Sequence, residues 1–399
     1  MSDKVWIAGG GVICGIGFNL NDCLQSFRQG HTGMAVMQYL RSIHQPVFPV
    51  AEVKADNTTL AEMAGMSAVW SRTALLSAIA AREAWKATGL GDIRQYRVGF
   101  VSANTVGGMD KTEDFFEPFL QDPQKGRLHQ VVHHECGTVT EGVADALGIT
   151  HHISTISTAC SSGANAIMYG ARLLKNNIVD IVIAGGTDAL TRFTINGFNT
   201  LMILDQEPCR PFDDSRKGLN LGEGAGYVIL VRESLLDQQG ITPWCRLSGY
   251  ANANDAYHQT ASSPDGTGNY LAMKGALDMA GLSPADIAYI NLHGTGTQNN
   301  DSSEATAIQR LFGAQLPPMS STKSFTGHTL GASGGIEAVF AAKAVQEGII
   351  YPNARFSTPM KELPVIPATA YTSGVQLSHA MSNSFGFGGN CSSLVFSAQ

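Results

Sequence analysis

The chain has 399 residues, of which 44% are hydrophobic and 15% are charged, a balance typical of a globular protein with a large core and not of a disordered chain. Its formal net charge of −7 argues against general nucleic-acid binding. Seven cysteines without a C-x-x-C pair argue against a disulfide framework and favour a reducing, cytoplasmic location, and no apolar run is long enough for a membrane span.

Strand-like and helix-like patterns alternate along residues 1–240. Residues 67–88 are rich in alanine and predict a long helix, and residues 21–29 predict a shorter one. Nearly continuous apolar runs such as residues 178–186 are typical of strands covered on both faces in a layered α/β fold. Residues 109–140, which mix charges, are interpreted as an irregular surface insertion. The predicted strands span residues 5–13, 96–102, 152–156, 178–186 and 227–231.

The alternation returns in residues 241–399, which we therefore predict to form a second unit. Shifting residues 162–177 by 171 positions places Ser162-Gly163 on Ser333-Gly334, a weak internal repeat. Two similar halves and a chance similarity of Ala/Gly-rich helices explain this repeat equally well. The predicted elements of the second unit include helix 269–280, strand 287–292 and helix 333–347.

Cys160 is the candidate nucleophile. It lies between a β-leaning run that ends at Ile156 and a helical pattern that starts near Ser162. The N-terminus of a helix carries unpaired N–H groups and the positive end of the helix dipole, so we expect a thiolate here. The alternative is a buried structural cysteine, which is the commoner fate of a lone cysteine.

Two histidines accompany the cysteine. His293 follows a predicted strand and opens the sequence HGTGT, in which Thr295 and Thr297 alternate and can point their hydroxyls the same way. His328 precedes the helix at residues 333–347. Nearby Lys323 disfavours a charged imidazolium, so we expect His328 to be neutral and able to donate one N–H. Glu337, on the first turns of that helix, is placed to balance Lys323; the alternative is a solvated face residue.

Glycine-rich turns complete the set of motifs. Residues 382–390 read SNSFGFGGN around Phe387, and glycines there let backbone N–H groups approach a ligand closely, as an oxyanion site requires. A phosphate loop is disfavoured because the glycines are not followed by Lys and then Ser/Thr as in a P-loop. Residues 211–218 and 222–226 are interpreted as structural support beside the site.

Together, TACSSG at Cys160, PFDDSRKG with GEGAG, DAYH at residues 255–258, HGTGT, KSFTGH and NSFGFGGN resemble the β-ketoacyl-(acyl carrier protein) synthases of the thiolase superfamily, over nearly the whole chain. The Cys-His-His combination resembles the elongating type. The resemblance implies an α/β fold of two similar βαβαβαββ halves in five α-β-α-β-α layers, here residues 1–240 and 241–399. It also implies a homodimer, or a heterodimer with a ketosynthase-like partner.

The resemblance also implies roles for individual residues. Cys160 is the acyl-accepting nucleophile, and His293 and His328 bind the malonyl thioester and promote decarboxylation. Lys323 supports His328, with Glu337 beside it. The remaining roles are an oxyanion hole made by backbone N–H groups of Cys160 and Phe387, an acyl-pocket gate at Phe387, contacts of Thr295 and Thr297 with the pantetheine arm, and acyl-tunnel walls at Val106 and Phe198. No metal and no organic cofactor is required.

The predicted reaction is decarboxylative Claisen condensation of an acyl thioester with malonyl-acyl carrier protein through acyl-Cys160, in fatty-acid or polyketide/polyene biosynthesis. A chain-length-factor-like assembly subunit is the alternative, and a cysteine hydrolase is a remote third. Three departures from the family pattern favour a specialised pathway: Gln298 and Asn300 follow HGTGT, the last loop lacks a Thr before Asn390, and Arg72 is the only basic residue of residues 62–72. Docking of the acidic carrier then falls to Lys111, Lys125, Arg127 or a partner chain.

Overall fold

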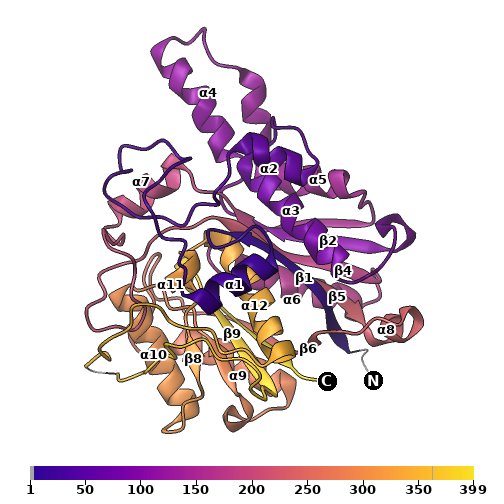
Figure 1. Ribbon diagram of the computed structural model, residues 1–399, viewed down its shortest axis with the longest axis vertical. Coiled ribbons are helices and arrows are strands. Elements are labelled where there is room, and N and C mark those ends of the chain that lie inside the picture. Colours follow the sequence, from indigo (N-terminus) through magenta and orange to yellow (C-terminus); the bar gives the residue numbers. More distant parts are fainter. Residues whose placement is uncertain (1–3, 362) are drawn as a thin grey trace.

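A computed structural model describes residues 4–361 and 363–399 (Figure 1). The strands are β1 (Val5–Cys14), β2 (Val98–Ala103), β3 (His152–Ile156), β4 (Ile181–Asp188), β5 (Gly224–Arg232), β6 (Cys245–Asn254), β7 (Tyr289–Asn291), β8 (Met319–Ser320), β9 (His379–Phe385) and β10 (Asn390–Ser397). The helices are α1 (Leu20–Gln29), α2 (Asn57–Ala64), α3 (Arg72–Lys86), α4 (Met109–Gln121), α5 (Cys136–Leu147), α6 (Ser162–Lys175), α7 (Arg192–Thr200), α8 (Glu233–Gln239), α9 (Thr267–Ala280), α10 (Gln298–Phe312), α11 (Lys323–Thr326) and α12 (Ser333–Glu347).

The sheet contains the same strand order twice. Over the described residues, ten strands lie in the order β3-β2-β4-β5-β1-β6-β10-β9-β7-β8. β2 is parallel to β3 and β4, whereas β5 is antiparallel to β4 and β1; in the second half β7, β8, β9, β10 and β6 repeat this pattern. The halves meet between β1 and β6 through two residue pairs, Trp6–Arg246 and Ile7–Cys245.

Helices form the other three layers. α3 packs on β1, β4 and β5, and α9 packs on β6 and β10, so these two helices cover opposite outer faces. α6 and α12 contact each other and lie between the two half-sheets, with α12 against both β5 and β9 (Figure 1). This arrangement confirms the predicted five-layered α/β fold. Among the described residues, no helix has the length and apolar character needed to cross a membrane.

The two central helices cross at very short distance. α6 begins at Ser162 and α12 at Ser333, the two residues that the 171-position shift superimposes. A Cβ atom on Gly163 would lie 2.4 Å from the backbone nitrogen of Gly335, so only glycine permits this approach. Because strand order, strand direction and these helices all recur, two similar halves account for the repeat better than chance similarity does.

Two predictions about local structure were wrong. Residues 109–140 are largely helical, and α4 protrudes at the top of Figure 1. Mixed charge and Pro118 inside α4 obscure its helical pattern in the sequence. The apolar signal is also weak, because only Thr112 and Phe115 of this helix are buried. The long helix starts at Arg72 and not at residue 67, because the Ser71 side chain caps it by accepting from the Ala74 N–H.

Candidate active site

Cys160 lies in the turn between β3 and α6, as predicted from the sequence. Its side chain is buried, and the preceding residue, Ala159, has a φ of 53°. An L-residue in this left-handed region costs free energy, and such strain is held where the surrounding structure demands it. A Cβ atom on Gly386 would lie 3.0 Å from the Cys160 nitrogen, so the glycine-rich turn before β10 closes over the cysteine.

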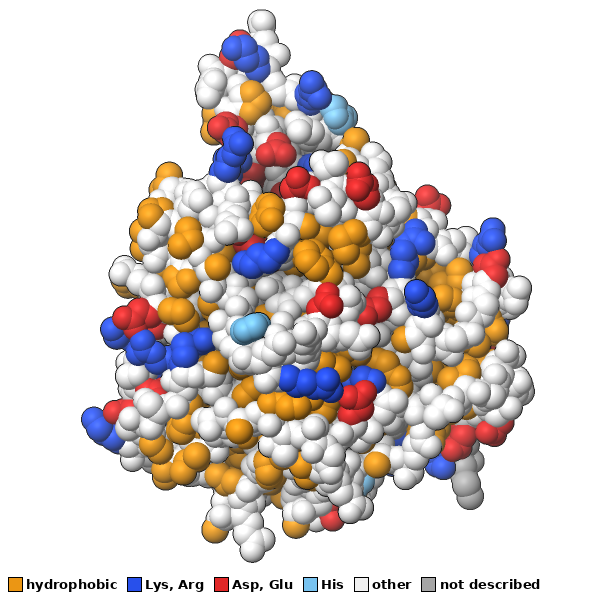
Figure 2. All heavy atoms as spheres, viewed as in Figure 1, with side chains coloured by type: hydrophobic (Ala, Val, Ile, Leu, Met, Phe, Trp, Pro, Cys, Tyr) orange, Lys and Arg blue, Asp and Glu red, His pale blue; other side chains and the backbone are white. Residues whose placement is uncertain are grey.

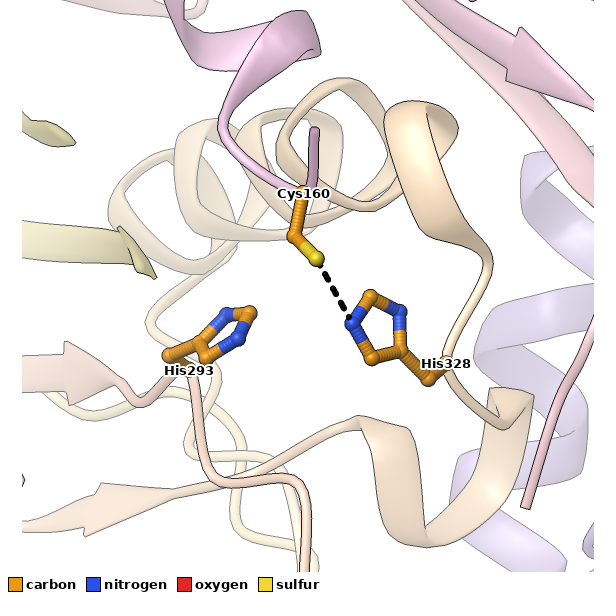
Figure 3. A group of neighbouring side chains, drawn as sticks. All are labelled: Cys160, His293 and His328. Atoms are coloured by element: carbon orange, nitrogen blue, oxygen red, sulfur yellow. Dashed lines mark hydrogen bonds between the residues drawn. The ribbon is translucent and has the colours of Figure 1, made fainter. Parts of the chain in front are cut away.

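His328 faces the cysteine directly (Figure 3). Its Nε2 lies 3.1 Å from Cys160 Sγ. Its Nδ1 accepts from the backbone N–H of Leu330 at 3.1 Å, and Leu330 also has a left-handed φ of 53°. Because a backbone N–H can only donate, the proton of the neutral ring must sit on Nε2. The backbone of Asn220 fixes the same loop by accepting from the His328 N–H at 2.8 Å.

His293 lies across from His328, with ring centroids 5.6 Å apart and rings at 87° (Figure 3). The carboxylate of Glu304 accepts from the N–H groups of His293 and Gly294 at 2.9 and 2.8 Å and so fixes the start of the HGTGT loop. The Nδ1 atom of His293 lies 3.3 Å from Lys323 Nζ. A lysine ammonium only donates, so this ring also carries its proton on Nε2.

Lys323 acts on His328 through its charge, which helps keep that ring neutral as predicted, whereas its direct contacts are to His293. Its ammonium contacts the ring of His293 and the His293 carbonyl oxygen, the latter at 2.7 Å, instead of supporting His328 by contact. It also donates to Glu337, a buried side chain, which confirms that Glu337 balances the lysine. Chain topology explains these contacts: Lys323, the first residue of α11, reaches the loop after β7 that carries His293, although it is closer to His328 in sequence.

Burial sets the charge state of the site. It lowers the pKa of His328 to about 3 and that of His293 well below its usual value, and the Lys323 charge adds to both effects. Burial also raises the pKa of the Cys160 thiol to about 11, outweighing the backbone N–H of Phe387 and the Lys323 charge. The expected thiolate was therefore wrong: the resting site holds a neutral thiol and two neutral imidazoles.

The same three side chains could in principle hold a metal ion. Ligand atoms of Cys160, His293 and His328 all lie within 4.8 Å of one another, and cysteine and histidine are ligands that zinc prefers. The tautomers argue against this use, because both Nε2 atoms carry a proton where a metal ligand needs a lone pair. These groups fit hydrogen-bond donation to an oxygen better.

A cavity of about 360 Å³ leads to these groups. The Phe387 ring stacks on Phe198 at 5.8 Å and 18°, which closes one side. The hydroxyls of Thr295 and Thr297 lie 2.9 Å apart, so they converge as expected. Val106 is not among the lining residues; it is buried in an apolar cluster with Leu219 and Leu330, behind the wall. The lining residues include Cys160, His293, His328, Thr295, Thr297, Phe198, Phe387, Met202 and Lys217.

Some contributors had no assigned role in the sequence prediction. Asn390 accepts from the Ser161 hydroxyl at 2.7 Å and ties the turn after Cys160 to the last loop; it stands inside the NSFGFGGN motif, which was a usable signal. Glu304, which accepts from the His293 and Gly294 N–H groups, is a second such residue. Arg72 is buried and ion-paired to Glu223 at 2.6 Å, so it is not available for carrier docking.

A buried thiol that faces two imidazole N–H donors, in a five-layered α-β-α-β-α fold, defines a condensing enzyme of the thiolase-like class. The chain belongs to the β-ketoacyl synthase family: the family model "Beta-ketoacyl synthase, N-terminal domain" matches residues 3–235 and "Beta-ketoacyl synthase, C-terminal domain" matches residues 244–357. The resemblance seen in the motifs is thereby confirmed.

Named relatives agree with this membership. The chain is 36% identical over 332 residues to 3-oxoacyl-[acyl-carrier-protein] synthase 2 of Staphylococcus aureus, covering 80% of this chain and 82% of the relative. It is 32% identical to Nodulation protein E of Rhizobium meliloti, covering 99% of both chains. The solved structure described as the ishigamide ketosynthase/chain length factor superimposes over 100% of both chains with a TM-score of 0.93 at 25% identity.

Proposed function

We propose that this chain catalyses the decarboxylative condensation of an acyl thioester with malonyl-acyl carrier protein, giving a β-ketoacyl-acyl carrier protein through acyl-Cys160. The observation that carries the proposal is the approach of Cys160 Sγ to His328 Nε2 at 3.1 Å, with His293 across the same space. The pathway is fatty-acid or polyketide/polyene biosynthesis. The intact Cys-His-His set gives no support to a non-catalytic chain-length-factor-like role.

The first half-reaction is acyl transfer. Cys160 sulfur attacks the acyl carbonyl of the carrier thioester, the bond to the carrier sulfur breaks, and the thiol proton passes to the departing carrier thiolate. The backbone N–H groups of Phe387 and Cys160 both interact with Sγ, which supports their proposed use as an oxyanion hole for the tetrahedral intermediate. The Nε2–H of His328 stabilises negative charge as it forms on sulfur.

The second half-reaction is decarboxylation and carbon–carbon bond formation. The malonyl thioester oxygen accepts the Nε2–H groups of His293 and His328. The bond to the carboxylate breaks, CO₂ leaves, and its electron pair enters the enolate that these two donors stabilise. The enolate carbon then attacks the acyl-Cys160 carbonyl, the bond to sulfur breaks, and the departing Cys160 thiolate takes a proton from solvent. Neutral donors preorganised in a buried site suit a transition state whose charge develops on oxygen.

Substrate positions follow from the cavity. Thr295 and Thr297 bind the amide-bearing pantetheine arm, and Phe387 gates the acyl pocket by leaving its stack on Phe198. Val106, behind the wall, limits how far an acyl chain can extend. The division of the chain into residues 1–240 and 241–399 is also part of the proposal; it is supported by the two family-model matches and by the strand order that restarts at β6.

The proposed partners are an acyl carrier protein and a second ketosynthase-like chain, in a homodimer or heterodimer. The similar structure described as the ishigamide ketosynthase/chain length factor supports the heterodimer. Lys and Arg are interspersed with Asp and Glu over the face in Figure 2, so carrier docking relies on individual residues such as Lys111, Lys125 and Arg127. The proposed location is cytoplasmic.

The deciding experiment offers the purified chain, alone and with a candidate partner subunit, a panel of acyl-carriers of increasing chain length. Peptide mass spectrometry should find the acyl group on Cys160, and adding malonyl-carrier should release CO₂ and lengthen the acyl chain by two carbons. Absence of acyl-Cys160 with every carrier and partner would refute the proposal.

A further inference from the structure

Asp188 is a buried carboxylate at the end of β4 for which no cation partner is found among the described residues. Instead it accepts hydrogen bonds from two segments that are far apart in sequence. One oxygen accepts from the N–H groups of Thr105 and Val106 at 2.9 Å each, and the other accepts from the Thr105 hydroxyl at 2.7 Å. The second oxygen also accepts from the Gly331 N–H at 2.7 Å.

The first of these segments is the turn after β2. Its residue Val106 belongs to the apolar cluster behind the cavity wall, together with Leu219 and Leu330, and Phe198 packs against that cluster. Asp188 therefore fixes the backbone of the turn on which the proposed limit of the acyl pocket stands.

The second segment is the loop that carries His328. Gly331 directly follows Leu330, whose N–H donates to His328 Nδ1 and whose φ is left-handed. The fit is tight, since a Cβ atom on Gly331 would lie 2.8 Å from Asp188 Oδ2. Fixing Gly331 thus holds Leu330 in its strained conformation and keeps its N–H aimed at the ring.

We infer that Asp188 is a positioning residue that couples the wall of the acyl pocket to the tautomer and placement of His328. An acyl chain that presses on residues 105–106 shifts the turn that Asp188 holds, and the same carboxylate passes that shift to Gly331 and Leu330. Decarboxylation then responds to what the acyl pocket contains. This inference rests on the proposed function.

Asp188→Asn tests the coupling because asparagine keeps the size but replaces one accepting oxygen with an NH₂ that faces donors. CO₂ release from malonyl-carrier should fall about tenfold, while acyl loading of Cys160 should change by less than about threefold. In the wild type, CO₂ release should depend on the length of the acyl chain on Cys160; in the variant that dependence should disappear. Asp180→Asn, just before the same strand and paired with Arg97, is the matched control.

A substrate-free readout separates this inference from the proposed function. The ¹⁵N spectrum of selectively labelled histidine should show His328 protonated on Nε2 in the wild type and a mixture of tautomers in Asp188→Asn. Thr105→Val, which removes only one hydroxyl donor, should show the same change to a smaller degree and covers the case of a poorly folding Asp188 variant. An unchanged tautomer in both variants, or an equal loss of loading and CO₂ release, would overturn the inference, whereas a wild type that neither loads nor decarboxylates would refute the function alone.

Discussion

The two halves of the chain share one strand order but contribute unequal chemistry. The first half supplies Cys160 at the start of α6, together with the pocket-wall residues. The second supplies His293, Lys323, His328 and Glu337, and the Phe387 loop. Their helices α6 and α12 cross so closely that Cys160 and His328 come within 3.1 Å. The nucleophile and the decarboxylating donors are thus built separately and joined at one helix crossing.

Both helix starts bring a reactive group to a place where the helix dipole favours negative charge, yet neither group is charged at rest. At Cys160, burial outweighs the dipole and keeps the thiol protonated. Before α12, burial and Lys323 keep His328 neutral. At Cys160 desolvation opposes the nearby N–H groups and positive charge and outweighs them, whereas at His328 desolvation and positive charge act in the same direction.

Cys160→Ser should have the largest effect on activity, because it removes the nucleophile that the first half supplies. A serine hydroxyl is a far weaker nucleophile near neutral pH, so loading and condensation should fall by about 10⁴-fold or more. CO₂ release from malonyl-carrier should survive to a greater extent because the second half is untouched. Mass spectrometry and CO₂ assays measure the two steps separately, with Cys136→Ser as control. An acyl group found on Cys209 or Cys391 would contradict the assignment.

Lys323→Ala should have the opposite selectivity. His293 loses the donor that fixes its tautomer, and Glu337 is left buried without its cation, so CO₂ release should fall by roughly 10²-fold while loading falls less than about tenfold. The Lys323→Met/Glu337→Gln double variant removes the unpaired charge and separates stability from catalysis. Lys343→Ala, which removes a half-buried lysine of α12 that pairs with Glu347, is the control. Equal loss of both half-reactions would show that the lysine does not act through His293.

Gly163→Ala tests the crossing of α6 and α12. The added Cβ atom would meet the Gly335 nitrogen at 2.4 Å, so the helices must separate, and the free energy of unfolding should fall by about 3 kcal/mol. Gly137→Ala in α5 is the matched control, because its Cβ would meet nothing within 4 Å. That substitution should be neutral or stabilise by up to about 1 kcal/mol. Urea unfolding measures the free energy of unfolding of both variants. An equal change in both would contradict a special role of the helix crossing in stability.

The pH dependence of the free energy of unfolding should report the neutral state of His328. The folded-state pKa of His328, about 3, lies below its usual value of 6.5, so as the pH falls below 6.5 the unfolded ring binds a proton that the folded ring does not. This contribution to stability is therefore present above pH 6.5 and lost as the pH falls towards 3. His328→Gln should reduce the loss between pH 7 and pH 5 by about 1 to 2 kcal/mol in urea titrations. An unchanged acid slope would contradict the neutral state.

Val106→Phe should have the smallest effect. The larger ring needs room that the cluster of Leu219 and Leu330 does not hold, so it pushes the wall into the cavity. The longest accepted acyl chain should shorten, with loading of long chains falling about tenfold and loading of short chains unchanged. Competition between carriers of different chain length measures this ratio. Equal loss at all lengths would refute the wall assignment.

Local patterns were enough to predict the elements around the nucleophile. β3 and α6 flank Cys160 as expected, and the continuous apolar runs became β4 and β5. The position of His328 before α12 was also predicted correctly, because the run of small residues after it indicates the start of a helix. Such features are readable since they depend on neighbours in sequence.

Other features depend on contacts between distant segments and could not be predicted in this way. The Lys323 contact with His293 joins α11 to the loop after β7, and Asp188 joins the turn after β2 to the loop that carries His328. The pKa of Cys160 depends on how many layers cover the helix start, which no local pattern reports. The burial of Arg72 in α3 depends on its ion pair with Glu223, which lies far away in sequence, directly before β5.

The position of β1 has a consequence for synthesis. This strand, Val5–Cys14, lies in the middle of the sheet, but its partners β5 and β6 begin at Gly224 and Cys245. At about 5–20 residues per second the ribosome delivers them roughly 10–40 seconds later. During that interval the apolar strand waits without a partner, open to chaperones and to aggregation, so the yield of folded protein should depend on translation speed and chaperone supply.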